Sequence, residues 1–255
     1  MRPHLGVVIP AFNEEVRLDK TLLRVREYLD AQDYTWCALV VSDGSTDGTM
    51  SIAKRFSESD SRFSAHEYFP NRGKGCAVRT GMMLLEADWL LLSDADLAAP
   101  IEEVEKLFDA KSPIAIGSRP LKESNLEVRQ PKLREMGGRA FNWIVQRLAI
   151  KGIKDTQCGF KLFEHDIAKD VFSRCEIDGY GYDFEALMIA NKLGYAIAEI
   201  PIRWAHQEGS KVRVLRDGSR TVYDLIKLRL TIGRRLKKPG YSEATSNDSS
   251  PTMTS

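Results

Sequence analysis

Short apolar runs alternate along the first half of the chain with stretches in which apolar residues recur every three or four positions. The runs predict strands, and the recurring stretches predict helices. Such an alternation indicates βαβ units, that is, an α/β, Rossmann-like, mostly parallel sheet with helices on both faces. The strands are expected at Leu5–Phe12, Cys37–Val41, Phe63–Phe69, Trp89–Ser93 and Ile114–Ser118, and the helices at Glu15–Ala31, Asp47–Phe56, Gly75–Ala87 and Pro100–Ala110.

The second half of the chain is less regular. It predicts strands at Gln157–Phe163 and Ala196–Trp204 and helices at Pro131–Ile150, Phe184–Leu193 and Ser219–Lys238. From Pro239 onward small and polar residues dominate without an apolar period, which predicts a disordered tail. The expected organisation is one α/β domain over 1–212, a basic amphipathic helical extension over 213–238 and a disordered tail over 239–255.

Composition narrows the class of protein. Hydrophobic residues make up 43% of the 255 residues and charged residues 29%, as in ordinary globular proteins. No apolar run approaches the ~18 residues that a membrane-spanning helix needs. The four cysteines follow no zinc-module spacing, and a chain of this size needs no disulfides, so reduced thiols and a cytoplasmic location are expected.

The charge is unevenly distributed. The net charge is +1, yet residues 211–238 contain ten Lys and Arg against only Asp217 and Asp224. A basic amphipathic helix over Ser219–Lys238 predicts peripheral contact with an anionic membrane surface, apolar face down, on the cytoplasmic side. The alternative is a helix packed on the domain with a solvated basic face.

Three predicted strands end in polar residues: Pro10–Glu15, Asp43–Thr49 and Asp94–Asp96. Each alone is compatible with a turn and helix-capping residues. All three, in order after apolar runs, predict one site at the carboxyl edge of the sheet. Asp94 and Asp96 are two positions apart and would face the same side, where two carboxylates suit Mg²⁺ or Mn²⁺ together with substrate phosphates.

Four further segments carry a family resemblance: NRGKGCAVR at 71–79, GSR at 117–119, DTQCGFKLF at 155–163 and GSK at 209–211. Together with the strand ends, they resemble the family 2 glycosyltransferases of GT-A fold. Within that family the match is to the polyprenyl-phosphate sugar synthases, and the 155–163 segment resembles the dolichyl-phosphate β-glucosyltransferase branch. The resemblance covers about residues 5–212.

The resemblance implies roles for individual residues. The nucleotide pocket would be lined by Pro10, Phe12 and Glu14, and Asp43 would accept a hydrogen bond from the base. Asp94 and Asp96 would bind the metal and the diphosphate, beside backbone groups of Ala95, with Asp96 thereby serving catalysis. Arg119 and Lys211 would meet the diphosphate charge. Two departures stand out: Ser42 replaces the first acid of the family's DDGS motif, and Ala98 replaces a glutamine of the mannosyl branch.

Two positions retain alternatives. Lys74 and Arg79 suit a phosphate-rich site, beside glycines that allow close backbone approach, but also a solvated helix start. Asp183 is the candidate catalytic base, with Glu185 and Asp155 as weaker alternates. For Asp183 the alternatives are a helix N-cap or, because a phosphate acceptor is already ionised, a residue that orients the acceptor.

These observations predict an inverting glycosyltransferase that moves a hexose, expected to be glucose from UDP-glucose, onto a polyprenyl or dolichyl phosphate. The alternatives are a family 2 enzyme using GDP-mannose or a soluble acceptor, and a sugar-nucleotide-binding regulator without turnover. Nucleic acid is not expected as a partner, because no stacking platform or recognised motif accompanies the basic segment.

Overall fold

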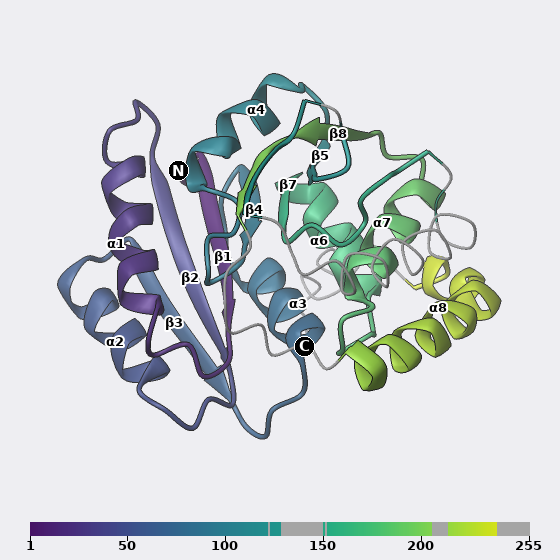
Figure 1. Cartoon of the computed structure of the whole chain (residues 1–255), viewed down its shortest axis with the longest axis horizontal. Helices are drawn as coiled ribbons and strands as arrows, with labels where there is room; N and C mark the ends of the chain where they lie inside the picture. The colour runs from purple at the N-terminus through teal and green to yellow at the C-terminus, as the bar shows by residue number, and fades with distance from the viewer. Residues whose placement is uncertain (122, 129–149, 151, 206–213, 239–255) are drawn as a thin grey trace, which may run out of the picture.

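A seven-stranded sheet forms the centre of the molecule in this computed structural model, which describes residues 1–121, 123–128, 150, 152–205 and 214–238 (Figure 1). The strand order is β3-β2-β1-β4-β7-β5-β8, and β7 alone runs antiparallel to its neighbours. The expected α/β, mostly parallel sheet is confirmed. Its strands are β1 (Leu5–Ala11), β2 (Trp36–Asp43), β3 (Phe63–Tyr68), β4 (Trp89–Ser93), β5 (Ile114–Ser118), β7 (Phe160–Glu164) and β8 (Ile197–Pro201).

Helices cover both faces of this sheet, and its central strands β1, β4 and β5 are apolar on both sides. One apolar core lies between the sheet and α1 (Leu18–Leu29), α2 (Thr49–Ser59), the 3₁₀ turn η1 (Ile101–Glu103) and α4 (Val104–Asp109). The other lies between the sheet and α3 (Lys74–Leu84), α6 (His165–Arg174) and α7 (Tyr182–Lys192). Burial of such near-continuous apolar strands is typical of parallel sheets.

Several elements differ from the sequence-based expectation. The strand over Ala196–Trp204 is divided at Ile202, so that β9 (Arg203–Ala205) pairs with β6 (Asn125–Val128) in a separate two-stranded sheet. Helix α6 was not predicted, and neither was the antiparallel insertion of β7 between β4 and β5. The predicted helix over Pro131–Ile150, the boundary at 212 and the tail fall on residues outside the described ranges, except for Ile150.

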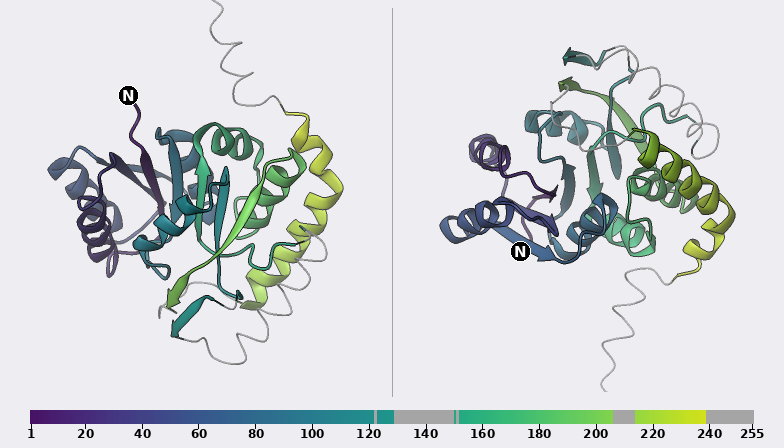
Figure 2. Two further views of the ribbon diagram at one scale, coloured as in Figure 1. Left: turned by 90° about the horizontal axis from the view of Figure 1, so that it is seen from above. Right: turned by 60° about the horizontal axis from the view of Figure 1, so that its bottom comes forward.

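Helix α8 (Val214–Leu236) begins earlier than predicted and lies along the outside of the molecule next to α7 (Figures 1 and 2). Leu225 and Leu228 are 0% and 1% exposed and belong to the core that α7 shares. These two leucines are packed on the domain and cannot meet a membrane, whereas the predicted membrane contact of the helix as a whole stays a prediction. Among the described helices, none is long and apolar enough to cross a bilayer.

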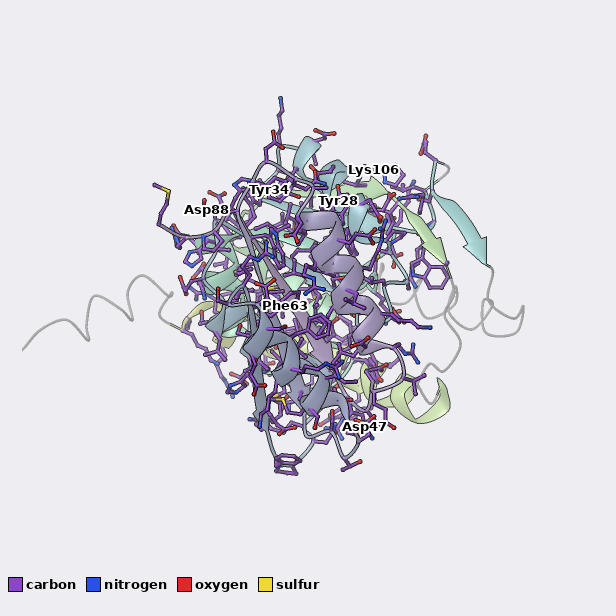
Figure 3. All side chains as sticks on the ribbon, turned by 90° about the vertical axis from the view of Figure 1, so that its left-hand side faces the viewer. Tyr28, Tyr34, Asp47, Phe63, Asp88 and Lys106 are labelled. Atoms are coloured by element: carbon purple, nitrogen blue, oxygen red, sulfur yellow. The ribbon has the colours of Figure 1, made fainter. Side chains whose placement is uncertain are left out.

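Because β1, β2 and β4 are parallel, the loops that follow them lie at one end of the molecule and the segments that precede them lie at the other. In Figure 3, Asp47, in the loop after β2, lies at one end, whereas Tyr34 and Asp88, which precede β2 and β4, lie at the other. The polar segments singled out from the sequence all follow the carboxyl ends of β1, β2 and β4. Parallel strands thus bring them to one edge of the sheet.

Candidate active site

Hydrogen bonds join the loops that follow β1 and β2. Asn13 donates its backbone N–H to Ser45 Oγ at 3.1 Å, and its side-chain Oδ1 accepts the backbone N–H of Thr46 at 2.7 Å. Glu14 donates its backbone N–H to Thr49 Oγ1 at 2.7 Å. Asn13 adopts a left-handed conformation with φ 53°, which asparagine tolerates better than most residues. The two loops therefore form one wall of the candidate site.

The predicted nucleotide-pocket residues lie on this wall. Pro10 is buried within β1, while Phe12 and Glu14 follow it and are half-buried. The Glu14 carboxylate pairs with Arg17 Nε at 2.7 Å. These positions suit a pocket lining, and their contact with a nucleotide stays a prediction.

Asp43 organises the approach to α3. Its Oδ1 accepts the backbone N–H of Arg72 at 2.8 Å, and its Oδ2 accepts the N–H of Gly73 at 2.8 Å and Asn71 Nδ2 at 2.9 Å. Gly73 has φ +116°, a conformation that favours glycine. Asp43 thus fixes the loop that leads to Lys74. Its expected hydrogen bond to the nucleotide base stays a prediction.

Ser42, which replaces the first aspartate of the family's DDGS motif, has a carboxylate from another strand beside it. Ser42 is fully buried, and its hydroxyl lies 2.9 Å from Glu67 Oε1 of β3 and 3.0 Å from Ser45 Oγ. The sequence gives no signal for this pairing, because Glu67 reaches the site only through the β2–β3 register. Glu67 thus places a carboxylate next to Ser42, close to where the motif's first aspartate would be.

Lys74 and Asp94 form the centre of the site. Lys74 Nζ lies 2.6 Å from Asp94 Oδ1 and 6.0 Å from the centre of the Tyr182 ring. Burial alone lowers the pKa of Lys74, but Asp94 and Asp183 raise it above the ordinary value, so the ammonium stays charged. The alternative of a solvated helix start is therefore wrong for Lys74. Arg79 instead pairs with Asp178 at 2.5 Å.

Gly159 lets Asp94 lie against the backbone of the 155–163 segment. A Cβ atom at Gly159 would come within 2.1 Å of Asp94 Oδ2. Since real Cβ atoms do not approach other atoms so closely, any other residue here would displace the carboxylate. The DTQCGFKLF segment thus packs directly against Asp94, and this close packing requires glycine at position 159.

Asp96 closes a tight turn after β4. Leu97 donates its N–H to the carbonyl of Asp94 at 3.1 Å and has φ 45°, and Ala98 donates to Asp96 Oδ1 at 3.0 Å. The carbonyl of Ala95 accepts Thr21 Oγ1 at 2.6 Å. Burial and, next, the charge of Asp94 raise the pKa of Asp96. A partly buried carboxylate whose ionisation is disfavoured by a neighbouring acid is a fitting place for a cation.

The donor set fits a hard divalent cation that is shared with phosphates. Asp94 and Asp96 offer carboxylate oxygens, which Mg²⁺ and Mn²⁺ prefer. Within the described ranges no group of three or more His, Cys, Asp or Glu residues could hold a metal by itself. The remaining ligands would have to come from the diphosphate and water.

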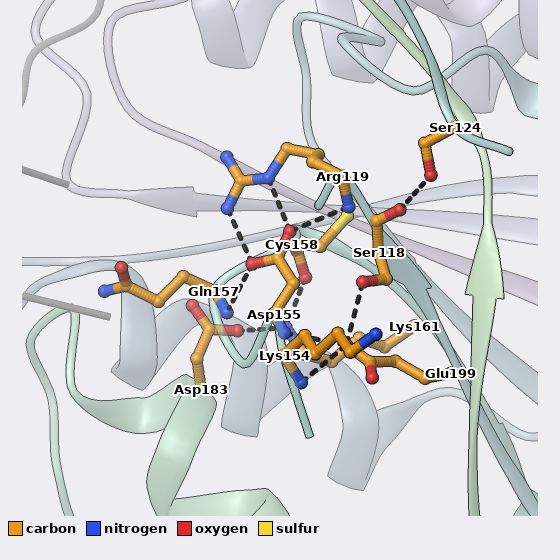
Figure 4. A network of polar contacts seen from close by, with 10 residues as sticks. All are labelled: Ser118, Arg119, Ser124, Lys154, Asp155, Gln157, Cys158, Lys161, Asp183 and Glu199. Carbon is orange, nitrogen blue, oxygen red and sulfur yellow. Dashed lines mark hydrogen bonds and ion pairs between the residues drawn. The ribbon is translucent and has the colours of Figure 1, made fainter. Parts of the chain in front are cut away.

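Arg119 is held by a buried acid. Its Nε and Nη2 donate to Asp155 Oδ2 and Oδ1 at 2.6 and 2.8 Å (Figure 4). Its guanidinium carbon lies 5.5 Å from the centre of the Trp204 ring. Burial by itself would raise the pKa of Asp155, but Arg119 holds it below the ordinary value. Asp155 thus orients Arg119, and its weaker candidacy as a base loses support. Lys211, the other expected diphosphate cation, lies outside the described residues.

Asp183 is buried and paired with Lys161. Lys161 Nζ donates to Asp183 Oδ1 and to the carbonyl of Cys158 (Figure 4). Burial raises the pKa of Asp183, while Lys161 and Lys74 oppose that rise. Gly181 occupies the N-cap position of α7 and Asp183 lies inside the helix, so the N-cap alternative is wrong. The assignment of Asp183 as catalytic base stays a prediction.

Glu185 serves a different purpose from its neighbour on α7. It is fully buried and accepts the backbone N–H groups of Glu176 and Ile177 at 3.0 and 2.7 Å. The segment it holds contacts the start of α3, where the N–H of Cys76 reaches the carbonyl of Asp178 at 3.2 Å. Glu185 is therefore a positioning group rather than a base.

A family model decides between the classes of enzyme. Residues 6–172 match the model described as "Glycosyl transferase family 2". The chain belongs to glycosyl transferase family 2. The expected glycosyltransferase class and α/β GT-A fold are thereby confirmed, and the regulator without turnover loses its support.

Two curated relatives of this glycosyltransferase are dolichyl-phosphate beta-glucosyltransferases. The chain is 34% identical over 224 residues to a dolichyl-phosphate beta-glucosyltransferase of Trichomonas vaginalis, covering 83% of this chain and 68% of that one. It is also 34% identical to the dolichyl-phosphate beta-glucosyltransferase of Homo sapiens, covering 82% of this chain and 69% of that one. The resemblance to that branch of the family is confirmed.

Solved structures share the fold of this glycosyltransferase. Mannosyl-3-phosphoglycerate synthase from Rubrobacter xylanophilus matches with a TM-score of 0.68 and 18% identity, covering 92% of this chain and 76% of that one. Glucosyl-3-phosphoglycerate synthase from Mycobacterium tuberculosis, in complex with Mn²⁺, UDP-glucose and phosphoglyceric acid, matches with a TM-score of 0.66 and 18% identity, covering 94% and 81%. Identities this low speak for the fold alone.

Proposed function

We propose that this enzyme transfers glucose from UDP-glucose to dolichyl phosphate, or to a shorter polyprenyl phosphate, with inversion at the anomeric carbon. The observation that carries the proposal is the fit of Gly159 beneath Asp94. It joins the DTQCGFKLF segment, by which the chain resembles the dolichyl-phosphate branch, to the acids that would serve the diphosphate. The names of the relatives at 34% identity support the same donor sugar and acceptor.

The cations of the site would receive the diphosphate charge that grows as the glycosidic bond to the donor breaks. Lys74 lies against Asp94 and stays charged, so its ammonium can move to a phosphate oxygen with a small displacement. Arg119 is held by Asp155 in a fixed orientation, which lowers the cost of ordering it when the donor binds. A divalent cation held by Asp94 and Asp96 would neutralise the leaving diphosphate.

The acceptor phosphate would attack the anomeric carbon from the face opposite the diphosphate. Because that phosphate is already ionised near neutral pH, no group has to remove a proton from it. Asp183 would then balance Lys161 and Lys74 at the floor of the site and orient the acceptor. This role agrees with its burial better than proton abstraction does.

The experiment is a transfer assay with radiolabelled UDP-glucose, UDP-galactose or GDP-mannose and a polyprenyl phosphate, followed by organic extraction. Label from UDP-glucose should enter the organic phase, and mild acid should release it as glucose. Label from GDP-mannose in that phase would contradict the donor assignment. Label that remains in the aqueous phase on 3-phosphoglycerate, offered in a parallel reaction, would contradict the lipid acceptor.

A further inference from the structure

Helix α8 has two opposite faces, and the inner one is fully engaged with the domain. Leu225 and Leu228 enter the core beside α7. Arg235 Nη2 lies 3.4 Å from Glu185 Oε1, and Arg174 Nη1 donates to the carbonyl of Leu236 at 2.8 Å. These contacts fix the rotation of the helix about its axis and so determine which residues face outward.

The outward face carries an apolar stripe. Tyr223, Ile226 and Leu230 are 63%, 49% and 82% exposed, and they follow one another at the three- and four-residue spacing that aligns side chains along a helix. We call these three residues the outer stripe. Exposed apolar side chains that gather in this way on a helix mark an interaction surface more often than isolated ones do.

Cations flank the outer stripe. Lys227, Arg234 and Lys237 are all exposed, and we call them the outer cations. Asp224 is the one acidic residue in the sequence between 220 and 238, and it is only partly exposed. Large apolar side chains beside unbalanced basic ones are the pattern of a helix that lies flat in a membrane interface.

We propose that the outward face of α8 is a docking surface for an anionic lipid bilayer, with the outer stripe inserted among the headgroups and the outer cations beside the lipid phosphates. Charge complementarity selects this occupant. A second copy of the chain packed on the same face would bring the outer cations of both copies together, and a nucleic acid would leave the outer stripe without an apolar partner. The enzyme would then be peripheral on the cytoplasmic face of a membrane.

The biological purpose of this surface rests on the proposed function, because a lipid-linked acceptor must be met at a bilayer. The binding itself does not depend on it, since no donor or acceptor is involved. The test is therefore sedimentation of the whole protein with vesicles of phosphatidylcholine, with and without phosphatidylserine, in the absence of any substrate.

The wild-type protein should sediment with the anionic vesicles at low salt and be released as salt rises, because the electrostatic attraction is screened. Changing the outer cations to glutamine (K227Q, R234Q, K237Q) should lower the partition coefficient by about a hundredfold. Changing the outer stripe to serine (Y223S, I226S, L230S) should lower it at every salt concentration. The matched control changes three exposed lysines elsewhere (K20Q, K54Q, K192Q) and should bind as the wild type does.

Each variant must keep the wild-type melting temperature and circular dichroism spectrum, which the exposure of these side chains leads us to expect. The proposal is overturned if the wild-type protein stays in the supernatant at low salt, or if the outer-stripe variant binds like the control. Light scattering that shows a dimer abolished by the outer-stripe changes would also overturn it in favour of a second copy. Failure of sugar transfer with intact vesicle binding would instead count against the proposed function alone.

Discussion

Lys74 Nζ lies 2.6 Å from Asp94 Oδ1, so the first acid of the Asp94–Asp96 segment has a cation of the protein's own beside it. The two residues come from different parts of the sheet edge, the start of α3 and the end of β4. A divalent cation bound at Asp94 would therefore share the Asp94 carboxylate with Lys74. Metal and nucleotide binding should therefore respond in opposite directions to the loss of this lysine.

Replacing Lys74 with methionine should strengthen the binding of Mn²⁺ alone and weaken the binding of UDP. The first effect follows because a positive charge next to Asp94 is removed, and the second because a phosphate loses a cation. We expect each change to be about tenfold, as one lost charge–charge contact in a partly buried site is worth roughly 1–2 kcal/mol. Titration calorimetry with each ligand separately measures both effects, and a parallel loss of both would contradict the shared carboxylate.

Replacing Asp96 with asparagine should lower sugar transfer by about a hundredfold or more, since the charge that neutralises the diphosphate is lost where it develops. The fold should survive, because the amide oxygen can still accept the N–H of Ala98. The rate is measured against Mg²⁺ and Mn²⁺ concentration, with and without a chelator. Wild-type turnover that persists in chelator would disprove a metal-dependent reaction, and D88N, at the opposite end of the sheet, serves as control.

Periodicity alone was enough to predict much of the parallel sheet. The strands β1, β2 and β4 are apolar on both sides, so they appear as unbroken runs, and their polar ends necessarily meet at one edge. Helix α6 was not predicted because Lys169 and Arg174 are buried on its inner face and interrupt its apolar pattern. The position of β7 between β4 and β5 was not predicted because strand order depends on long-range pairing, which a local sequence pattern does not show.

The site residues were predicted better than their partners. Asp94, Asp96 and Asp183 were found by their place at element ends, but nothing local indicates that Lys161 would turn into the protein toward Asp183. In the sequence Lys161 looks like the polar position of an alternating strand. The same holds for Asp155, whose bond to Arg119 is visible only once the chain is folded.

Replacing Gly159 with alanine should impair metal-dependent transfer because the new Cβ would meet Asp94 Oδ2 at 2.1 Å and force the carboxylate away from Lys74. Turnover should fall by more than about tenfold, while the melting temperature changes by only a few degrees, as the displaced side chain is at the edge of the core. The matched control is G179A, where a Cβ meets nothing within 4 Å. Equal activity of the two variants would contradict the close fit.

Glu185 should give the protein a stability that falls as pH rises toward neutrality. Burial raises its pKa to about 7 from the ordinary value of 4.5, so between these values the folded state binds a proton that the unfolded state has released. Its contribution is fully present below about pH 4.5 and is lost as pH rises through 7. At 1.36 kcal/mol for each pKa unit, the loss reaches at most about 3 kcal/mol.

Replacing Glu185 with glutamine should remove that dependence, because the amide oxygen can still accept the N–H groups of Glu176 and Ile177 but carries no titrating proton. The free energy of unfolding in urea, measured between pH 5 and 8, should decline more steeply for the wild-type protein than for E185Q. The control E58Q, exposed on α2, should decline as the wild type does. Parallel curves for the wild type and E185Q would mean that Arg235, 3.4 Å away, keeps Glu185 ionised throughout this range.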